Sequence, residues 1–207
     1  MLKLTNTFKK LQKAYTSKKY RYIIMQGGSS SSKTFSILQL LFEIARKHNK
    51  QIDIIGQTST HLRSGVLNDM PAVARQFEYN WDDRFRSSIK QYKHDAGSLN
   101  FWSFDKLGKA HGGRRDILFL NEANHIHYNI AEQLMIRTRD LIIIDYNPTN
   151  EFWVHNKILK EEADKAILIK STYLDNQYLE KAIIDTLEAK RGNNNFWRVY
   201  GLGDLVS

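Results

Sequence analysis

The sequence predicts an α/β fold with a mostly parallel central sheet that is flanked by helices on both faces. Apolar runs typical of fully buried strands, such as 22–25, 116–120 and 141–144, alternate with amphipathic stretches of helical period. The chain has 207 residues, of which 42% are hydrophobic, and this is enough for one substantial core but crowded for two. We therefore expect a single domain over residues 1–207.

The first 20 residues are basic, and their lysines alternate with Phe8, Leu11 and Tyr15. This pattern predicts a basic N-terminal helix or arm, and it lacks the apolar core of a signal peptide. No apolar stretch approaches the length of a membrane span, so we expect no membrane contact. The chain has no cysteine, which excludes disulfides, thiolate chemistry and thiolate-bound zinc. A cytoplasmic location fits these features best.

The most informative pattern is a strand, a small-residue loop and a helix between residues 22 and 47. Small residues let successive backbone N–H groups turn toward a polyphosphate, and the start of the helix adds its positive dipole end. The lysine that opens the helix can reach the β- and γ-phosphates of ATP, and the threonine hydroxyl can hold Mg²⁺. The predicted nucleotide-binding residues are Gly27, Gly28, Ser29, Ser30, Ser31, Ser32, Lys33 and Thr34.

This loop departs from the pattern G-x-x-x-x-G-K-[ST] at one position, because Ser32 stands where the second glycine is expected. Serine fits at no cost if the backbone is helical there, whereas a positive φ would cost free energy. The alternative interpretation is a flexible Ser-rich linker. A linker is seldom placed between a hydrophobic strand and a well-patterned helix, so context favours the phosphate loop.

The remaining elements continue the alternation of strands and helices. We expect a helix over 60–77 that is broken near Met70-Pro71, and antiparallel or edge strands at 88–92 and 98–104. The other expected elements are strands at 51–58, 116–120, 141–144 and 165–173, helices at 129–138 and 151–164, and two amphipathic segments that close the chain.

Polar side chains follow two of the buried strands, at the sheet edge where ligands bind in such folds. Glu122 follows strand 116–120, and its carboxylate can orient and deprotonate a water that attacks the γ-phosphate. Asn147 follows strand 141–144 and would hydrogen-bond the γ-phosphate or the attacking water. It is equally suited to be a turn residue before Pro148.

Asn121 stands where ATPases of this kind usually have an aspartate that accepts hydrogen bonds from Mg²⁺-bound water. We expect Thr34 and Asn121 at the metal, with a lower Mg²⁺ affinity or help from another acid such as Asp145. Glu122 with two nearby histidines could be mistaken for a metal cluster, but no second acidic or histidine set lies close in sequence.

Charge that develops on the transferred phosphoryl group calls for an arginine. Arg63 is the first candidate for this arginine finger. The other candidates are Arg114, Arg115, Arg137 and Arg139.

The net charge of +9, from 31 Lys+Arg against 22 Asp+Glu, suggests a polyanionic partner such as DNA. A solvated basic face is the alternative. The candidate DNA contacts are the N-terminal lysines together with Arg84, Arg86, Lys90 and Lys93.

With these pieces in order, the chain resembles the N-terminal ATPase domain of the large terminase subunit of tailed bacteriophages over nearly its whole length. GGSSSSKT stands where those proteins carry a GGRGSGKS-like loop, and LFLNEAN resembles their Walker B segment. IRTR and IIIDYNPT resemble their coupling segment, and STYLDNQYL and FWRVYGLGD resemble their linker region. The resemblance implies an ASCE-type P-loop ATPase that uses ATP and Mg²⁺ to move double-stranded DNA into a procapsid.

The resemblance also implies partners and an assembly. These are a portal protein, a small terminase subunit and a homo-oligomeric ring, typically a pentamer. No acidic cluster follows residue 203, so we expect the C-terminal nuclease half of such proteins to be absent. Two other functions stay open: another P-loop translocase such as a helicase, and a basic DNA-binding module with a decayed phosphate loop.

Overall fold

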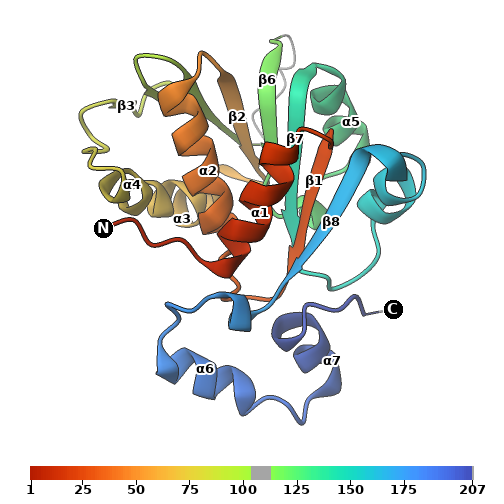
Figure 1. Cartoon of the computed structure of the whole chain (residues 1–207). Helices are drawn as coiled ribbons and strands as arrows, with labels where there is room; N and C mark the ends of the chain where they lie inside the picture. Colours follow the sequence, from red (N-terminus) through yellow and green to blue (C-terminus); the bar gives the residue numbers. More distant parts are fainter. Residues whose placement is uncertain (104–112, 207) are drawn as a thin grey trace. The chain divides into compact units, whose positions relative to one another are not determined.

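The computed structural model describes residues 1–103 and 113–206. The chain forms two compact units, and each is assembled from two separate stretches of sequence. Figure 1 shows the helices and strands, coloured along the sequence. The first unit comprises Met1–Leu2 and Ile37–Ile144, and the second comprises Lys3–Ser36 and Asp145–Ser207.

Six of the eight described strands lie in the first unit, in the order β3-β4-β5-β2-β6-β7, except that the last two residues of β7 belong to the second unit. The β2–β5, β2–β6 and β6–β7 pairs are parallel, whereas β3–β4 and β4–β5 are antiparallel. The antiparallel pair expected from the sequence is confirmed by β4 and β5, but β5 also pairs with β2 and is therefore an interior strand. Position 104 of that expected strand lies outside the described residues. The strand bounds are β2 (Gln51–Gly56), β3 (Phe85–Arg86), β4 (Gln91–Lys93), β5 (Ser98–Ser103), β6 (Arg115–Leu120) and β7 (Thr138–Tyr146).

The helices of the first unit include α3 (Ser59–Ser64) and α4 (Val66–Gln76), which replace the expected helix over 60–77. The prediction of a break near Met70-Pro71 was wrong. The break between the two helices falls at Gly65, and Pro71 lies inside α4. Gly65 leaves the helical conformation (φ −101°, ψ −99°), and its N–H closes α3 on the His61 carbonyl at 2.9 Å.

α5 (Tyr128–Ile136) lies wholly in this unit. α2 (Lys33–Lys47) belongs to it from Ile37 onward. α3 packs on β2 and β5, and α5 packs on β6. The apolar face of α2 brings Phe42 into an aromatic cluster with Phe77, Tyr92 and His94, at ring-centroid distances of 5.2, 5.4 and 4.6 Å. Burial in this cluster lowers the pKa of His94 to about 4, so the imidazole is neutral at pH 7.

The second unit is built on the parallel pair of β1 (Tyr22–Gly27) and β8 (Ala166–Ser171). Every residue of β1 is buried, as its continuous apolar run predicts. α1 (Asn6–Ser17) packs on both strands and confirms the expected N-terminal helix. The remaining elements are turns of π- or 3₁₀-helix at Val154–Leu159, Ala163–Lys165, Tyr173–Asp175 and Trp197–Gly201, with α6 (Lys181–Glu188) and α7 (Asn194–Phe196).

These pairings confirm the mostly parallel sheet with packed helices that the sequence predicts. In the part of the chain that the structure describes, no helix is both long and apolar enough to cross a bilayer.

Candidate nucleotide-binding site

The loop that joins β1 to α2 spans residues 28–32 and lies in the second unit; we call it the phosphate loop. Among the described residues, the amide N–H groups of Ser29 to Ser32 donate to no protein acceptor. The carbonyls of the loop behave in the opposite way. The Gly28 carbonyl accepts from the Ser31 hydroxyl at 2.8 Å. The amide donors of the phosphate loop therefore face a ligand side, and its acceptors are used inside the protein.

Two residues from distant parts of the chain hold the phosphate loop by its carbonyls. Thr7, at the start of α1, is fully buried and donates its hydroxyl to the Ser31 carbonyl at 2.6 Å. Asn176, which follows β8 by five positions, donates its side-chain amide to the Ser30 carbonyl at 3.0 Å. These bonds fix the loop from its protein side, so its N–H groups need little reorganisation to bind an anion.

The backbone of the phosphate loop is left-handed at Ser30 (φ 67°) and at Ser32 (φ 61°). A left-handed residue set among right-handed neighbours turns successive N–H groups to one side and makes an anion-binding concavity. Ser32 therefore occupies the position that calls for glycine, and its side chain incurs the conformational cost considered above. That side chain makes a compensating contact, because its hydroxyl lies 2.8 Å from the Thr5 hydroxyl.

Gly27 and Gly28 are required for a different reason, the close approach of other backbone segments. A Cβ added at Gly27 would lie 2.2 Å from the carbonyl oxygen of Ser171, at the end of β8. A Cβ added at Gly28 would lie 2.0 Å from the carbonyl oxygen of Tyr200. Neither contact can be relieved by a side-chain rotation, because both partners are backbone atoms.

Lys33 opens α2 and is buried, with its ammonium folded over the phosphate loop. Its Nζ donates to the carbonyls of Gly27 and Gly28 at 2.8 and 3.1 Å. It also donates to Oδ1 of Asn147 at 3.0 Å, which joins the predicted phosphate lysine to the predicted sensor.

Thr34 makes a matching contact one residue further on, where its hydroxyl donates to Oδ2 of Asp145 at 2.5 Å. Asp145 is 1% exposed and lies at the end of β7, two positions before Asn147. β7 ends at Tyr146, so Thr34 contacts the end of the strand and Lys33 contacts the residue just beyond it. The structure thus brings together the phosphate loop, Lys33, Thr34 and the polar end of β7.

Glu122 lies in the first unit, directly after β6 and Asn121. Its backbone is left-handed (φ 52°, ψ 53°), and it opens the 3₁₀ turn Ala123–His125. Strained residues of this kind concentrate at functional sites. The carboxylate is 44% exposed and lies 3.3 Å from Nδ1 of His61 on α3. His61 was not expected from the sequence, because a lone histidine on a helix carries no spacing signal.

The candidate arginines have different surroundings. Arg63 lies on α3 two positions after His61 and is exposed. Arg115 is buried and pairs with Asp53, Nε to Oδ2, at 2.6 Å, and it also donates to the Leu134 carbonyl at 2.8 Å. This arrangement removes Arg115 from the arginine-finger candidates, because its guanidinium is committed to the core of its own unit.

Glu122 lies near His61 and three positions before His125, which ends the 3₁₀ turn, but in the described part of the chain this set does not have the form of a metal site. Within residues 1–103 and 113–206, no group of three or more histidine, aspartate or glutamate side chains is placed to hold a metal ion. In the second unit, the oxygen donors suited to Mg²⁺ are the hydroxyl of Thr34 and the carboxylate of Asp145.

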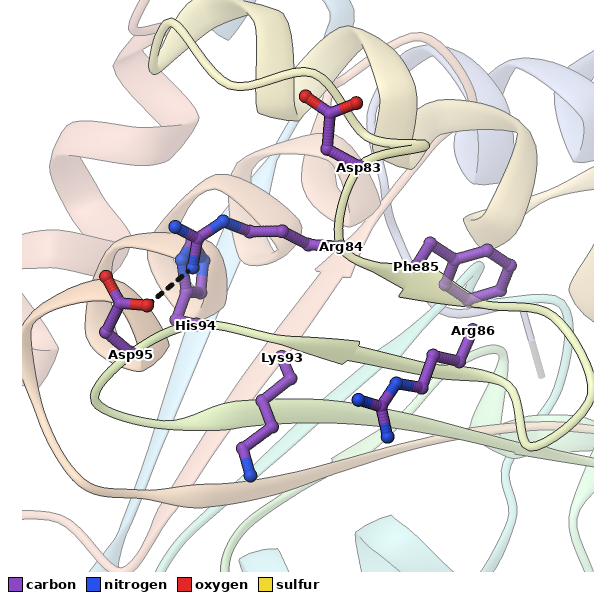
Figure 2. A pocket seen from close by; sticks show the side chains of 7 residues that line it. All are labelled: Asp83, Arg84, Phe85, Arg86, Lys93, His94 and Asp95. Atoms are coloured by element: carbon purple, nitrogen blue, oxygen red, sulfur yellow. Dashed lines mark hydrogen bonds and ion pairs between the residues drawn. The ribbon is translucent and has the colours of Figure 1, made fainter.

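Three of the candidate DNA contacts, Arg84, Arg86 and Lys93, line one cavity of about 320 Å³ at the β3–β4 hairpin (Figure 2). Arg84 pairs with Asp95 at 3.0 Å, whereas Arg86 and Lys93 are exposed and form no ion pair with any described residue. Phe85 stacks on Trp81 at a centroid distance of 4.6 Å and anchors the hairpin. Lys90 does not line this cavity, because it lies in the turn that precedes β4.

Sequence reasoning missed the residues that support the phosphate loop, namely Thr7, Asn176 and the backbone at Tyr200. None carries a local motif, since each acts through a contact with a segment more than 20 positions away. The segments around positions 176 and 200 stand out in the sequence only as part of the resemblance described above.

A strand, a small-residue loop whose amide donors have no described protein acceptor, a helix that opens with a buried lysine, and a threonine held by a carboxylate define the chain as a P-loop NTPase. The particular family follows from a sequence comparison. The family model described as "Phage terminase large subunit" matches residues 19–204, so the chain belongs to that family. No curated protein matches at a significant level of sequence similarity.

Solved structures of large terminases share the fold. The large terminase of a thermophilic bacteriophage is 16% identical with a TM-score of 0.83, and the match covers 99% of this chain and 54% of that one. The same protein in complex with ADP is 17% identical, with a TM-score of 0.76 and coverage of 99% and 54%. The HK97 bacteriophage large terminase is 12% identical, with a TM-score of 0.77 and coverage of 99% and 51%. The chain therefore spans about half the length of these relatives.

Proposed function

We propose that this chain is the ATPase domain of a viral DNA-packaging motor, which hydrolyses ATP to ADP and phosphate to translocate double-stranded DNA into a procapsid. The observation that carries the proposal is the phosphate loop, whose amide donors have no described protein acceptor while its carbonyls are held from behind. Successive donors of this kind match a ligand with several acceptor oxygens, such as a polyphosphate. Membership of the terminase family and the ADP complex of a relative support a nucleotide as that ligand.

In this proposal the residues from Gly27 to Thr34 bind the phosphates. Lys33 exchanges its carbonyl partners for oxygens of the β- and γ-phosphates. The donor set near the loop is rich in oxygen and suits Mg²⁺, which when bound would neutralise charge on the β- and γ-oxygens. Thr34 would contribute to that site, and Asn121 is the second residue that the sequence predicts for it.

The catalytic step needs a base, a sensor and a counter-charge. Glu122 accepts a proton from the attacking water, and its strained backbone supports such a role. Asn147, which contacts Lys33, hydrogen-bonds the γ-phosphate or the water. Arg63 stabilises charge that develops in the transition state, and its exposure on α3 is compatible with reaching a nucleotide held by the same or a neighbouring subunit.

The assembled motor is proposed to act as a homo-oligomeric ring, typically a pentamer, with a portal protein and a small terminase subunit in the host cytoplasm. The proposed single domain over 1–207, with its basic arm at 1–20, would supply the ATPase activity of that motor. Arg84, Arg86, Lys90 and Lys93 would contact the DNA backbone, and the exposure of Arg86 and Lys93 on one hairpin supports this. Such contacts would weaken with salt and show no sequence preference.

Three variants test the proposal by calorimetry with ATP and Mg²⁺ and by phosphate release in the presence of DNA. Lys33→Ala should lose nucleotide binding, whereas Lys47→Ala, at the other end of α2, should bind like the wild type. Glu122→Gln should keep binding and lose hydrolysis by about 100-fold or more.

Other outcomes separate the alternatives. No heat with millimolar nucleotide in the wild-type chain would favour a decayed phosphate loop on a DNA-binding module. Separation of DNA strands by the purified chain would favour a helicase. Unchanged hydrolysis in Glu122→Gln would remove Glu122 as the base.

A further inference from the structure

The contact between Thr34 and Asp145 has a chemical consequence for the metal site. The Thr34 hydroxyl donates its only hydrogen to Oδ2 of Asp145 at 2.5 Å, a length typical of a charge-assisted hydrogen bond. With the hydrogen committed, the lone pairs of the Thr34 oxygen are directed away from Asp145. Such an oxygen, held by a carboxylate, is a preorganised ligand for a hard cation.

The same contact supplies a negative charge to the site. Asp145 is 1% exposed, and a buried carboxylate is costly unless it is hydrogen-bonded or lies beside a cation. Lys33, next to Thr34 in sequence, provides positive charge at the start of α2. A divalent cation between the phosphates and Thr34 would add to this compensation.

Asp145 can be compared with Asn121, which stands where an aspartate is usual in such ATPases. Leu120 of β6 and Ile144 of β7 are partners in the parallel register. Asn121 follows the first of these residues and Asp145 follows the second. The neutral amide therefore follows the last residue of β6, and the carboxylate follows the residue of β7 that pairs with it. The acid comes from the next strand along the chain rather than from the strand after which the motif predicts it.

We infer that Asp145, and not Asn121, is the residue that confers Mg²⁺ affinity on the nucleotide site, by orienting the Thr34 hydroxyl and by accepting hydrogen bonds from metal-bound water. This inference rests on the proposed function. It assigns to β7 a role that the order of motifs would give to β6.

The test is a measurement of ATPγS affinity by calorimetry, in EDTA and in Mg²⁺. It compares the wild type with the isosteric variant Asp145→Asn and the truncating variant Asn121→Ala. Asp145→Asn should keep its Mg²⁺-free affinity and lose the tightening by Mg²⁺ by about 10- to 100-fold. Asn121→Ala should keep the tightening within about twofold. Electron paramagnetic resonance of Mn²⁺ with ATPγS gives a second readout, and the bound-Mn²⁺ signal should weaken in Asp145→Asn alone.

The opposite pattern overturns the inference: Asn121→Ala loses the Mg²⁺ effect, or a folded Asp145→Asn retains it. The Asn121→Ala result decides even if thermal melts show that Asp145→Asn is unfolded. Absence of ATPγS binding by the wild type in both buffers would instead overturn the proposed function, so the two failures are distinguishable.

Discussion

The left-handed backbone at Ser32 allows a quantitative test of the phosphate loop. The perturbation is a pair of substitutions at Ser32, to Gly and to Ala, with the same pair at Ser29 as a control. Ser32 has a φ of 61°, whereas Ser29 is not among the described residues with positive φ and is exposed. Both substitutions at Ser32 remove the hydroxyl that contacts Thr5 at 2.8 Å, so this loss is the same for both.

The expected magnitude follows from two opposing terms. A Cβ in the left-handed region costs about 1–2 kcal/mol, and glycine avoids this cost. Glycine loses about 0.4–1 kcal/mol more than alanine on folding, because its unfolded chain is freer. At Ser29 only the second term acts, so Ser29→Ala should be more stable than Ser29→Gly. The preference for Gly over Ala should therefore rise by about 1–2 kcal/mol between Ser29 and Ser32.

Urea unfolding of the four variants, followed by circular dichroism, measures these differences. In thermal melts, 1 kcal/mol corresponds to about 2–4 °C for a chain of this size. If Ser32→Ala and Ser29→Ala stand in the same relation to their glycine counterparts, the loop is not left-handed at Ser32. The anion-binding geometry assigned to the phosphate loop would then be refuted.

Three further predictions concern the first unit. The unfolded chain protonates His94 near its ordinary pKa of 6.5 while the folded pKa is about 4, so stability is complete above pH 7 and is lost as the pH falls from 6.5 toward 4. The loss at pH 5 should be about 2 kcal/mol by urea unfolding, and His94→Phe should not show it. Arg115→Ala leaves the Asp53 carboxylate without its buried partner and should cost about 3–5 kcal/mol of unfolding free energy. Arg139→Ala, at a side chain that is 53% exposed, should cost less than about 1 kcal/mol, and equal costs would contradict the structural role of Arg115. His61→Ala should lower kcat about tenfold at unchanged KM if the 3.3 Å contact positions Glu122, whereas an unaltered kcat, or an equal effect of His125→Ala, would show that it does not.

The sequence alone was sufficient for the elements with a strong local signal. The continuous apolar runs of β1, β6 and β7 predicted buried parallel strands, because a strand covered on both faces has no polar side. The small-residue segment from Gly27 to Thr34 predicted the phosphate loop and the start of α2. Local signals failed where two residues competed for one role, as when Gly65 rather than Pro71 ended the helix.

What the sequence by itself determined is the chemistry available: a loop of small residues, a lysine and threonine at a helix start, and polar groups after two buried strands. Only the tertiary structure decided how these groups are used, because hydrogen bonds between distant segments leave no pattern in the chain. Thr7 holding the Ser31 carbonyl and Asp145 holding the Thr34 hydroxyl are both of this kind. Burial likewise separated Arg115, which serves its own core, from Arg63, which is exposed.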